Sequence, residues 1–207
     1  MIGAGAGALL IADGVTTIIW QEPLSALYAQ HEQDRLTAEL PGVVRRFAPL
    51  ARGKVRLPSL ASEARKLARI TPANGPLGRI AIPSLGVRFV MVQGTADTAL
   101  TLGPGHYTGT VLPGQPGTVG IAGHRTTYLA PFKRVDRLGR GARIVLHMPY
   151  GRFTYRVTGR RAVSPTDTSV LRSHGGAQRL VLTTCDPLFS DAQRLVVFAA
   201  LRSVRRS

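Results

Sequence analysis

The stretch RLVLTTCDP, residues 179–187, is an apolar run that leads directly into a cysteine and then into Asp-Pro. A short run rich in β-branched and apolar residues, followed by a turn signal, is typical of a buried strand. Cys185 is the only cysteine among 207 residues, so it can form neither an internal disulfide nor a multi-cysteine metal site. The pattern therefore predicts a lone thiol where a strand ends.

Similar short runs occur from Thr71-Pro72 onward, with Gly and Pro between them. Strands at this spacing predict an all-β barrel or sandwich over residues 72–207. We expect an irregular loop at 103–117 and a helical turn at 130–138. The predicted strands are LGRIAI, VRFVMV, GTVGIA, ARIVLHM, RFTYRVTGRRAV, RLVLTT and RLVVFAAL.

The N-terminal segment carries one charge, Asp13, across residues 2–20. A run of this length is close to the roughly 20 residues that span a bilayer core. We expect a membrane anchor over residues 1–21, although Asp13 costs about 2.5–3.5 kcal/mol near the centre of such a helix. A cleaved signal peptide and a buried helix or hairpin are the alternatives.

Residues 22–71 are expected to form a basic, partly helical stalk. An amphipathic helix over 22–40 should end at Pro41-Gly42, and SEARKLARI should form a short second helix. The apolar face of the first helix is predicted to contain Leu24, Leu27, Tyr28, Leu36 and Leu40, and that of the second Leu60, Ala64, Leu67 and Ala68.

The composition is strongly basic, with 27 Lys and Arg, 11 Asp and Glu, and a formal net charge of +16. An anionic membrane surface and an acidic envelope are partners that fit this charge, and a merely solvated stalk fits it equally well. Nucleic acid is not expected as a partner, because no aromatic-basic platform accompanies the charge.

Three side chains carry the predicted chemistry. His124, in GIAGHRTTY, follows one predicted strand, Cys185 ends another, and Arg194 begins the next. If the strands of Cys185 and Arg194 are antiparallel neighbours, these two residues meet at one end of the barrel. A thiolate attacks, an imidazole transfers protons and a guanidinium holds an oxyanion, which together suit acyl transfer through a thioester.

Other interpretations of these residues remain open at this point. A free cysteine is often a small buried hydrophobe, and the chain contains 24 arginines. An L,D-transpeptidase is a rival enzyme, but the segment Ser173-His174-Gly175 is followed by glycine instead of the required cysteine. A catalytically silent module that binds an anionic polymer is the third alternative.

The motifs around the three residues resemble those of the sortase family. VLTTC is similar to the sortase signature T-L-x-T-C, with Val181 in place of the first Thr, and AGHR resembles the segment of the catalytic histidine. The segments GPGHY, LPGQPG and WQEPLSALYA resemble actinobacterial class E sortases. The resemblance implies an eight-stranded sortase-type β-barrel, held outside the cell by a single membrane-spanning anchor.

The same resemblance implies roles and partners. His124, Cys185 and Arg194 would be the acid/base, the nucleophile and the substrate or oxyanion residue. Thr184, His106 and Tyr128 are expected to contact substrate. The implied substrates are surface proteins with a C-terminal LPxTG or LAxTG sorting signal, and the acceptor is an amine of a cell-wall precursor. A pilin-polymerising sortase and a different envelope cysteine acyltransferase or hydrolase are the alternative functions.

No cofactor and no metal are expected. The acidic residues beyond position 71 are scattered and form no oxygen-rich ligand run, and no glycine-rich phosphate loop followed by Lys is present. These acidic residues are Asp97, Asp136, Asp167, Asp186 and Asp191.

Overall fold

The computed structural model describes residues 23–47, 57–173 and 175–205. Eight strands form the body of the protein. They are β1 (Pro76–Ile82), β2 (Val87–Gln93), β3 (Gly105–His106), β4 (Gly117–Ala122), β5 (Arg143–Met148), β6 (Gly151–Val163), β7 (Gln178–Asp186) and β8 (Gln193–Arg205). The helical elements are α2 (Pro23–Val44), α3 (Leu57–Ile70), α4 (Asp97–Leu100), η1 (Pro83–Leu85), η2 (Val135–Arg137) and η3 (Thr168–Leu171).

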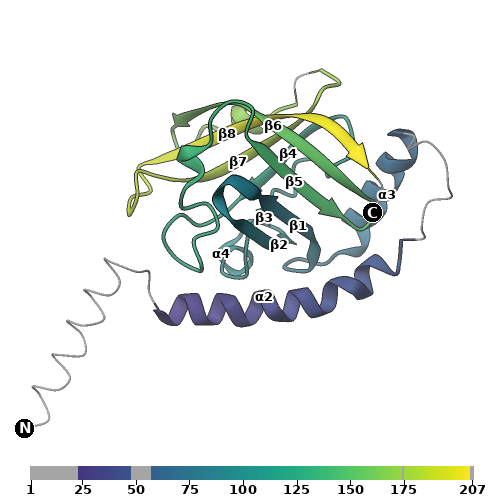
Figure 1. Ribbon diagram of the computed structural model, residues 1–207, viewed down its shortest axis with the longest axis horizontal. Coiled ribbons are helices and arrows are strands. Elements are labelled where there is room, and N and C mark those ends of the chain that lie inside the picture. Colours follow the sequence, from purple (N-terminus) through teal and green to yellow (C-terminus); the bar gives the residue numbers. More distant parts are fainter. Residues whose placement is uncertain (1–22, 48–56, 174, 206–207) are drawn as a thin grey trace, which may run out of the picture.

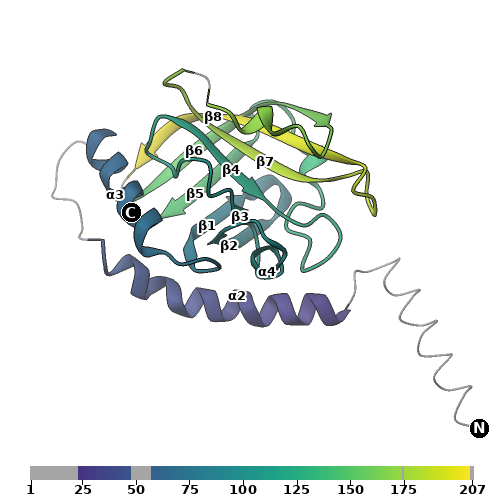
Figure 2. The same cartoon turned by 180° about the vertical axis from the view of Figure 1, so that it is seen from behind.

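The strands close into a barrel in the order β1-β2-β3-β4-β7-β8-β6-β5, and β5 pairs back onto β1 (Figures 1 and 2). The pairs β2/β3 and β4/β7 are parallel, and the others are antiparallel. This architecture confirms the predicted eight-stranded β-barrel with short helices. Each predicted run forms a strand, and the two-residue strand β3 lies inside the loop that was expected to be irregular.

Alternation of side chains along the strands fills the barrel. In β6, Phe153 and Tyr155 are both fully buried, and Ile80, Leu146 and Leu182 from other strands pack in the same core. Successive strand residues point to opposite faces, so every second position reaches this core. Burying a side chain of this size contributes roughly 1.5–3 kcal/mol, and the barrel gains its rigidity from many such contacts.

Helix α2 lies along the outside of β1 and β2 (Figure 1). The predicted apolar face is wrong in its first half, because Leu24, Leu27 and Tyr28 are exposed. The helix continues through Pro41, and the amide of Arg45 donates to the carbonyl of Pro41 at 3.0 Å. The face that contacts the barrel has helical spacing and contains Ser25, Ala29, Gln33, Leu36 and Leu40.

Helix α3 adds apolar side chains to the barrel core. Leu60, Ala64 and Leu67 are at most 1 % exposed and belong to the main core cluster, as predicted. Ala68 is exposed, so its place on this face is a wrong prediction. The spacing of four and then three residues puts the other three on one side of the helix.

The predicted membrane anchor over residues 1–21 lies outside the described residues. Among the helices that the structure describes, none has the length and apolar character needed to cross a membrane. The boundary between a stalk and a barrel at residue 72 stays a prediction, although α2 contacts the barrel along its length.

Gln33 is the polar contact that fixes α2 on the barrel. Its side-chain amide donates to the carbonyls of Val90 (3.0 Å) and Leu102 (2.7 Å), and its oxygen accepts from the amide of Val90 (2.7 Å). Each of these backbone groups is buried with the side chain. A buried backbone group that loses its partner costs about 1–3 kcal/mol.

We expect Gln33→Ala to lower the free energy of unfolding by roughly 2–4 kcal/mol, since several buried backbone groups lose their partners. Urea unfolding measures this difference. Gln30→Ala is the matched control, because Gln30 is exposed on the same helix and donates only to Asp34. Equal losses from the two variants would contradict the role of Gln33.

Candidate active site

The site lies where the parallel strands β4 and β7 end. Ala122 of β4 is the register partner of Thr183 of β7. His124 and Cys185 each lie two residues further along, so both lie at this end of the β4/β7 pair, and Cys185 is still part of β7. Parallel neighbours end at the same edge of a sheet, so His124 and Cys185 come together although they are far apart in the sequence.

Arg194 approaches the same end from β8. Cys185 and Arg194 are direct register partners in the antiparallel pair β7/β8, as the sequence predicted. The guanidinium of Arg194 donates to the carbonyls of Asp191 (2.9 Å) and Gln193 (3.1 Å), which holds it against the β7–β8 loop. Within the described part of the chain, no hydrogen bond joins the side chains of His124, Cys185 and Arg194.

The thiol of Cys185 is free and half-buried. It shares the outer face of β7 with Val181 and Thr183, whereas Leu180 and Leu182 point into the core. The sulfur is therefore not a filler of the barrel interior. It sits on an outer surface, at a strand end, with an arginine opposite.

Two hydrogen bonds continue the β4/β7 ladder beyond the last paired residues. The amide of Gly123 donates to the carbonyl of Thr183 at 3.1 Å, and the hydroxyl of Thr184 donates to the carbonyl of Gly123 at 2.7 Å. Thr184 is 3 % exposed. The buried hydroxyl of Thr184 thus connects the residue before Cys185 to the residue before His124. The predicted contact of Thr184 with substrate stays a prediction.

A tight loop returns the chain over His124. The amide of Phe132 donates to the carbonyl of His124 at 3.1 Å, and a Cβ on Gly123 would lie 2.7 Å from the Phe132 ring. Glycine is therefore required before His124. Tyr128, Leu129 and Ala130 all have positive φ, a conformation that costs roughly 1–2 kcal/mol per residue.

Tyr128 covers the imidazole of His124. The two ring centroids are 5.1 Å apart, and the rings are tilted by 36°. Burial lowers the pKa of His124 below its ordinary value of 6.5, and the charge of Asp97 partly opposes this shift. The neutral imidazole is favoured as a result, which is the form that can accept a proton.

Arg125 connects the histidine segment to the cysteine segment. Its guanidinium donates to the carbonyl of Cys185 at 3.1 Å and forms a close ion pair with the carboxylate of Asp186. A longer contact of 3.5 Å reaches Asp136. Arg125 is 6 % exposed, so this ion pair is largely removed from water.

His106 is fixed away from solvent. Its ring bonds to the side chain of Gln93 (2.9 Å), the carbonyl of Val111 (3.2 Å) and the hydroxyl of Thr110 (3.1 Å), and it is 3 % exposed. Burial lowers its pKa to about 4. Its expected contact with substrate stays a prediction. The next residue, Tyr107, hydrogen-bonds to Thr183 at 2.9 Å and so lies beside the outer face of β7.

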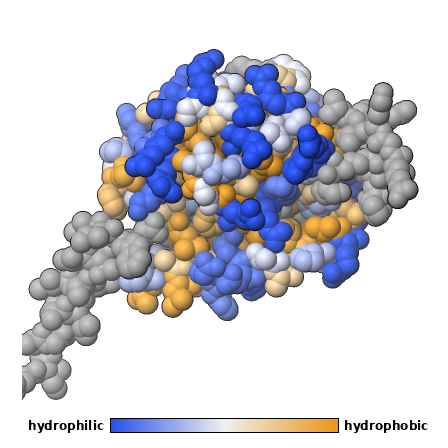
Figure 3. Space-filling view, in the orientation of Figure 1, coloured by the Kyte–Doolittle hydropathy of each residue, from blue (hydrophilic) through white to orange (hydrophobic). Residues whose placement is uncertain are grey.

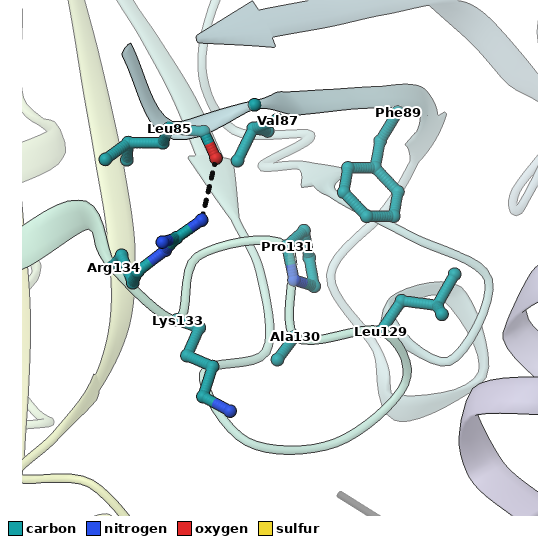
Figure 4. A pocket seen from close by; sticks show the side chains of 9 residues that line it. Leu85, Val87, Phe89, Leu129, Ala130, Pro131, Lys133 and Arg134 are labelled. Atoms are coloured by element: carbon teal, nitrogen blue, oxygen red, sulfur yellow. Dashed lines mark hydrogen bonds between the residues drawn. The ribbon is translucent and has the colours of Figure 1, made fainter. Parts of the chain in front are cut away.

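A groove of about 450 Å³ is lined in part by the loop that follows His124 (Figure 4). Leu85, Val87 and Phe89 form one wall, and the other is formed by the loop residues Leu129, Ala130, Pro131, Lys133 and Arg134. Arg134 closes one end through a bond to the carbonyl of Leu85 at 3.2 Å. None of the three predicted catalytic residues lines this groove.

No group of three or more His, Cys, Asp or Glu side chains among the described residues is arranged to hold an ion. The expected absence of a metal and of a cofactor stays a prediction.

Comparison with known proteins places this arrangement in a family. The model of the sortase domain matches residues 80–202, which is more than half of the chain and includes His124, Cys185 and Arg194. The chain belongs to the sortase family. Sortases are cysteine transpeptidases, and the predicted resemblance is confirmed at this level.

The most similar proteins include more than one class of sortase. Sortase D of Bacillus subtilis is 32% identical over 126 residues, which cover 60% of this chain and 62% of that protein. The chain thus spans about three fifths of this relative. Two solved structures are sortase E from Streptomyces avermitilis (34% identity, TM-score 0.60, 65% of this chain and 93% of that one) and sortase D5 from Clostridium perfringens (27%, 0.62, 69% and 88%).

Sequence reasoning missed Arg125 and Tyr107 as parts of the site. Arg125 follows the predicted histidine directly, but the chain contains 24 arginines and nothing in the sequence marks this one as buried. Tyr107 lies in a Gly/Pro-rich loop whose path depends on β3. Adjacency to a site motif was the one available signal for both residues.

We expect a double-mutant cycle to couple Arg125 and Asp186. Arg125→Met leaves a carboxylate without its counter-charge beside the sulfur, and it should lower the free energy of unfolding by about 2–3 kcal/mol, less than for a fully buried pair. The anionic thiolate is disfavoured there, so alkylation of Cys185 by iodoacetamide should slow. Asp186→Asn in the same protein should restore part of both losses.

Urea unfolding and alkylation rates measure the two effects of this cycle. Asp136→Asn is the control, since it removes only the longer, half-exposed contact of Arg125. Strictly additive effects of the two substitutions would show that the ion pair does not couple the segments.

We expect His106 to make stability depend on pH. The folded state favours the neutral ring, so its stabilisation is complete above pH 6.5 and is lost as the pH falls towards about 4. The shift corresponds to about 3 kcal/mol. The stability difference between the wild type and His106→Gln should shrink by that amount over this window, as followed by urea unfolding. A constant difference would contradict the burial of a neutral ring.

Proposed function

We propose that the chain is a membrane-anchored transpeptidase with its barrel outside the cell. It cleaves a C-terminal LPxTG or LAxTG sorting signal after Thr and transfers the acyl group to an amine of a cell-wall precursor. The observation that carries this proposal is the convergence of His124, Cys185 and Arg194 at one barrel end. Family membership and the half-exposed thiol support it.

The first half of the reaction forms a thioester. The sulfur of Cys185 gives its proton to the neutral imidazole of His124 and attacks the threonine carbonyl carbon. The resulting oxyanion accepts hydrogen bonds from the guanidinium of Arg194, which never loses its charge near neutral pH. The C–N bond then breaks, and His124 returns the proton to the departing amine.

The second half transfers the acyl group. An acceptor amine attacks the thioester carbonyl and His124 takes its proton; the C–S bond then breaks, and His124 passes that proton to the sulfur, which restores the thiol and the neutral imidazole. One terminal nitrogen of the Arg194 guanidinium donates to the loop carbonyls of Asp191 and Gln193. Its other N–H groups are available to the substrate.

The subclass is proposed to be class E-like, on the strength of the GPGHY segment and of the likeness to sortase E. Sortase D of Bacillus subtilis has a similar identity to this chain, 32%. Turnover of peptides that differ at the second position of the signal therefore tests the class E-like assignment. Pilin polymerisation differs from anchoring only in the acceptor amine, and competition between acceptors distinguishes the two functions.

Peptides that contain LAxTG or LPxTG, mixed with an amine, should give ligated product and a covalent adduct on Cys185. Cys185→Ala should reduce turnover by about three orders of magnitude or more. We expect losses of about 10²–10⁴ for His124→Ala and of about 10²–10³ for Arg194→Lys. Mass spectrometry reports the adduct, its site and the preferred peptide together.

His147→Ala is the matched histidine control, since His147 points outward from β5 and should leave turnover unchanged. Full turnover by Cys185→Ala would remove the nucleophile assignment. Hydrolysed peptide without ligation, at saturating amine, would identify a hydrolase instead of a transpeptidase.

A further inference from the structure

A row of basic side chains crosses the outer face of the barrel. Arg79 of β1 is the register partner of His147 of β5, His147 is the partner of Arg152 of β6, and Arg152 is the partner of Arg205 of β8. We call these four residues the basic row. Neighbouring strands are about 4.8 Å apart, so the row is roughly 14 Å long.

The row faces solvent. His147 and Arg205 are exposed, Arg79 and Arg152 are half-exposed, and each lies next to an inward-pointing residue in its strand. Figure 3 shows hydrophilic side chains gathered over the face where Figure 1 labels β5 and β6. Within the described residues, none of the four forms an ion pair with an acidic group.

Positive charges placed directly opposite one another across strands destabilise a sheet. The effect is visible at His147, whose pKa is lowered first by desolvation and then by the charges of Arg152, Arg88 and Arg79. Among the described residues, no acidic side chain pairs with the row to offset this repulsion. An anionic ligand that spans several of these cations would relieve it.

The shape beside the row suits a linear ligand. A groove of about 370 Å³ runs between helix α2 and the row, with Leu40 and Val44 on the helix side and Arg79, His147 and Arg152 on the strand side. A second groove of about 540 Å³ continues past Arg79 and Arg88 along α2. Asp34 is the one acidic residue that lines either groove.

We propose that the basic row and its groove bind a linear polymer of phosphate groups. The phosphates would pair with Arg79, Arg152 and Arg205, and arginine is well suited to this because its planar guanidinium matches phosphate geometry. Two grooves that share Arg79 and are both lined by α2 favour a chain over the flat surface of a bilayer. Arg205 ends β8, whereas Arg194, the partner of Cys185, lies near the start of the same strand, so a chain bound to the row leaves Cys185 accessible.

Fluorescence anisotropy with labelled inorganic polyphosphate tests this site on the full chain, at about 50 and 200 mM salt. Arg79→Gln/Arg152→Gln should weaken binding about tenfold and reduce the salt slope by about 1.4, because two phosphate contacts are lost at roughly 0.7 each. Arg137→Gln/Arg140→Gln is the control with equal loss of charge, at the far end of β5. It should change the affinity less than twofold.

Equal weakening by the two double variants would overturn the site, because binding would then follow net charge alone. Absence of binding by the wild type would overturn it as well. Capture by vesicles that contain phosphatidylglycerol, without binding to polyphosphate, would assign the face to a membrane instead. Peptide turnover should be unchanged in both double variants, so this site and the transpeptidase proposal can fail separately.

Discussion

The parallel pairing of β4 with β7 is the constraint on which the site depends. Parallel neighbours cannot be joined by a hairpin, so the chain between Ala122 and Gln178 must travel round the barrel through β5 and β6 before it returns. That detour is what brings His124 and Cys185 from distant parts of the sequence to one edge. A slip of one residue would exchange Thr184 and Cys185 between the faces of the sheet, and the sulfur would enter the core.

Three further residues hold the ends of β4 and β7 together beyond their last paired residues. Gly123 supplies an amide where no side chain fits, Thr184 supplies a hydroxyl to a carbonyl, and Arg125 supplies a buried charge. These contacts join the segment of His124 to the segment of Cys185, both before and after the two residues. The imidazole and the sulfur therefore need no bond to each other in order to keep their relative positions.

The sequence predicted the features that depend on residues close together in the chain. The alternating runs predicted all the long strands, and the hairpin logic placed Arg194 opposite Cys185 correctly. It was uninformative where contacts are long-range. Leu24, Leu27 and Tyr28 looked like the buried face of a helix, yet the barrel selects Ser25, Ala29 and Gln33, because small side chains and one satisfied amide let the helix approach closely. Burial of Arg125 depends on Asp186, and that partner is visible only after folding.

Helix α2 reaches the site as well as the sheet. The amide of Tyr128, whose ring covers His124, lies 3.5 Å from the hydroxyl of Ser25 in the first turn of the helix. Tyr128 has a backbone conformation that is costly for any residue but glycine, so it requires support from its surroundings. The same helix is fixed to β2 by Gln33, two turns further along. A series of contacts thus runs from the barrel wall through α2 to the ring that covers the imidazole, so α2 supports the candidate site as well as the sheet.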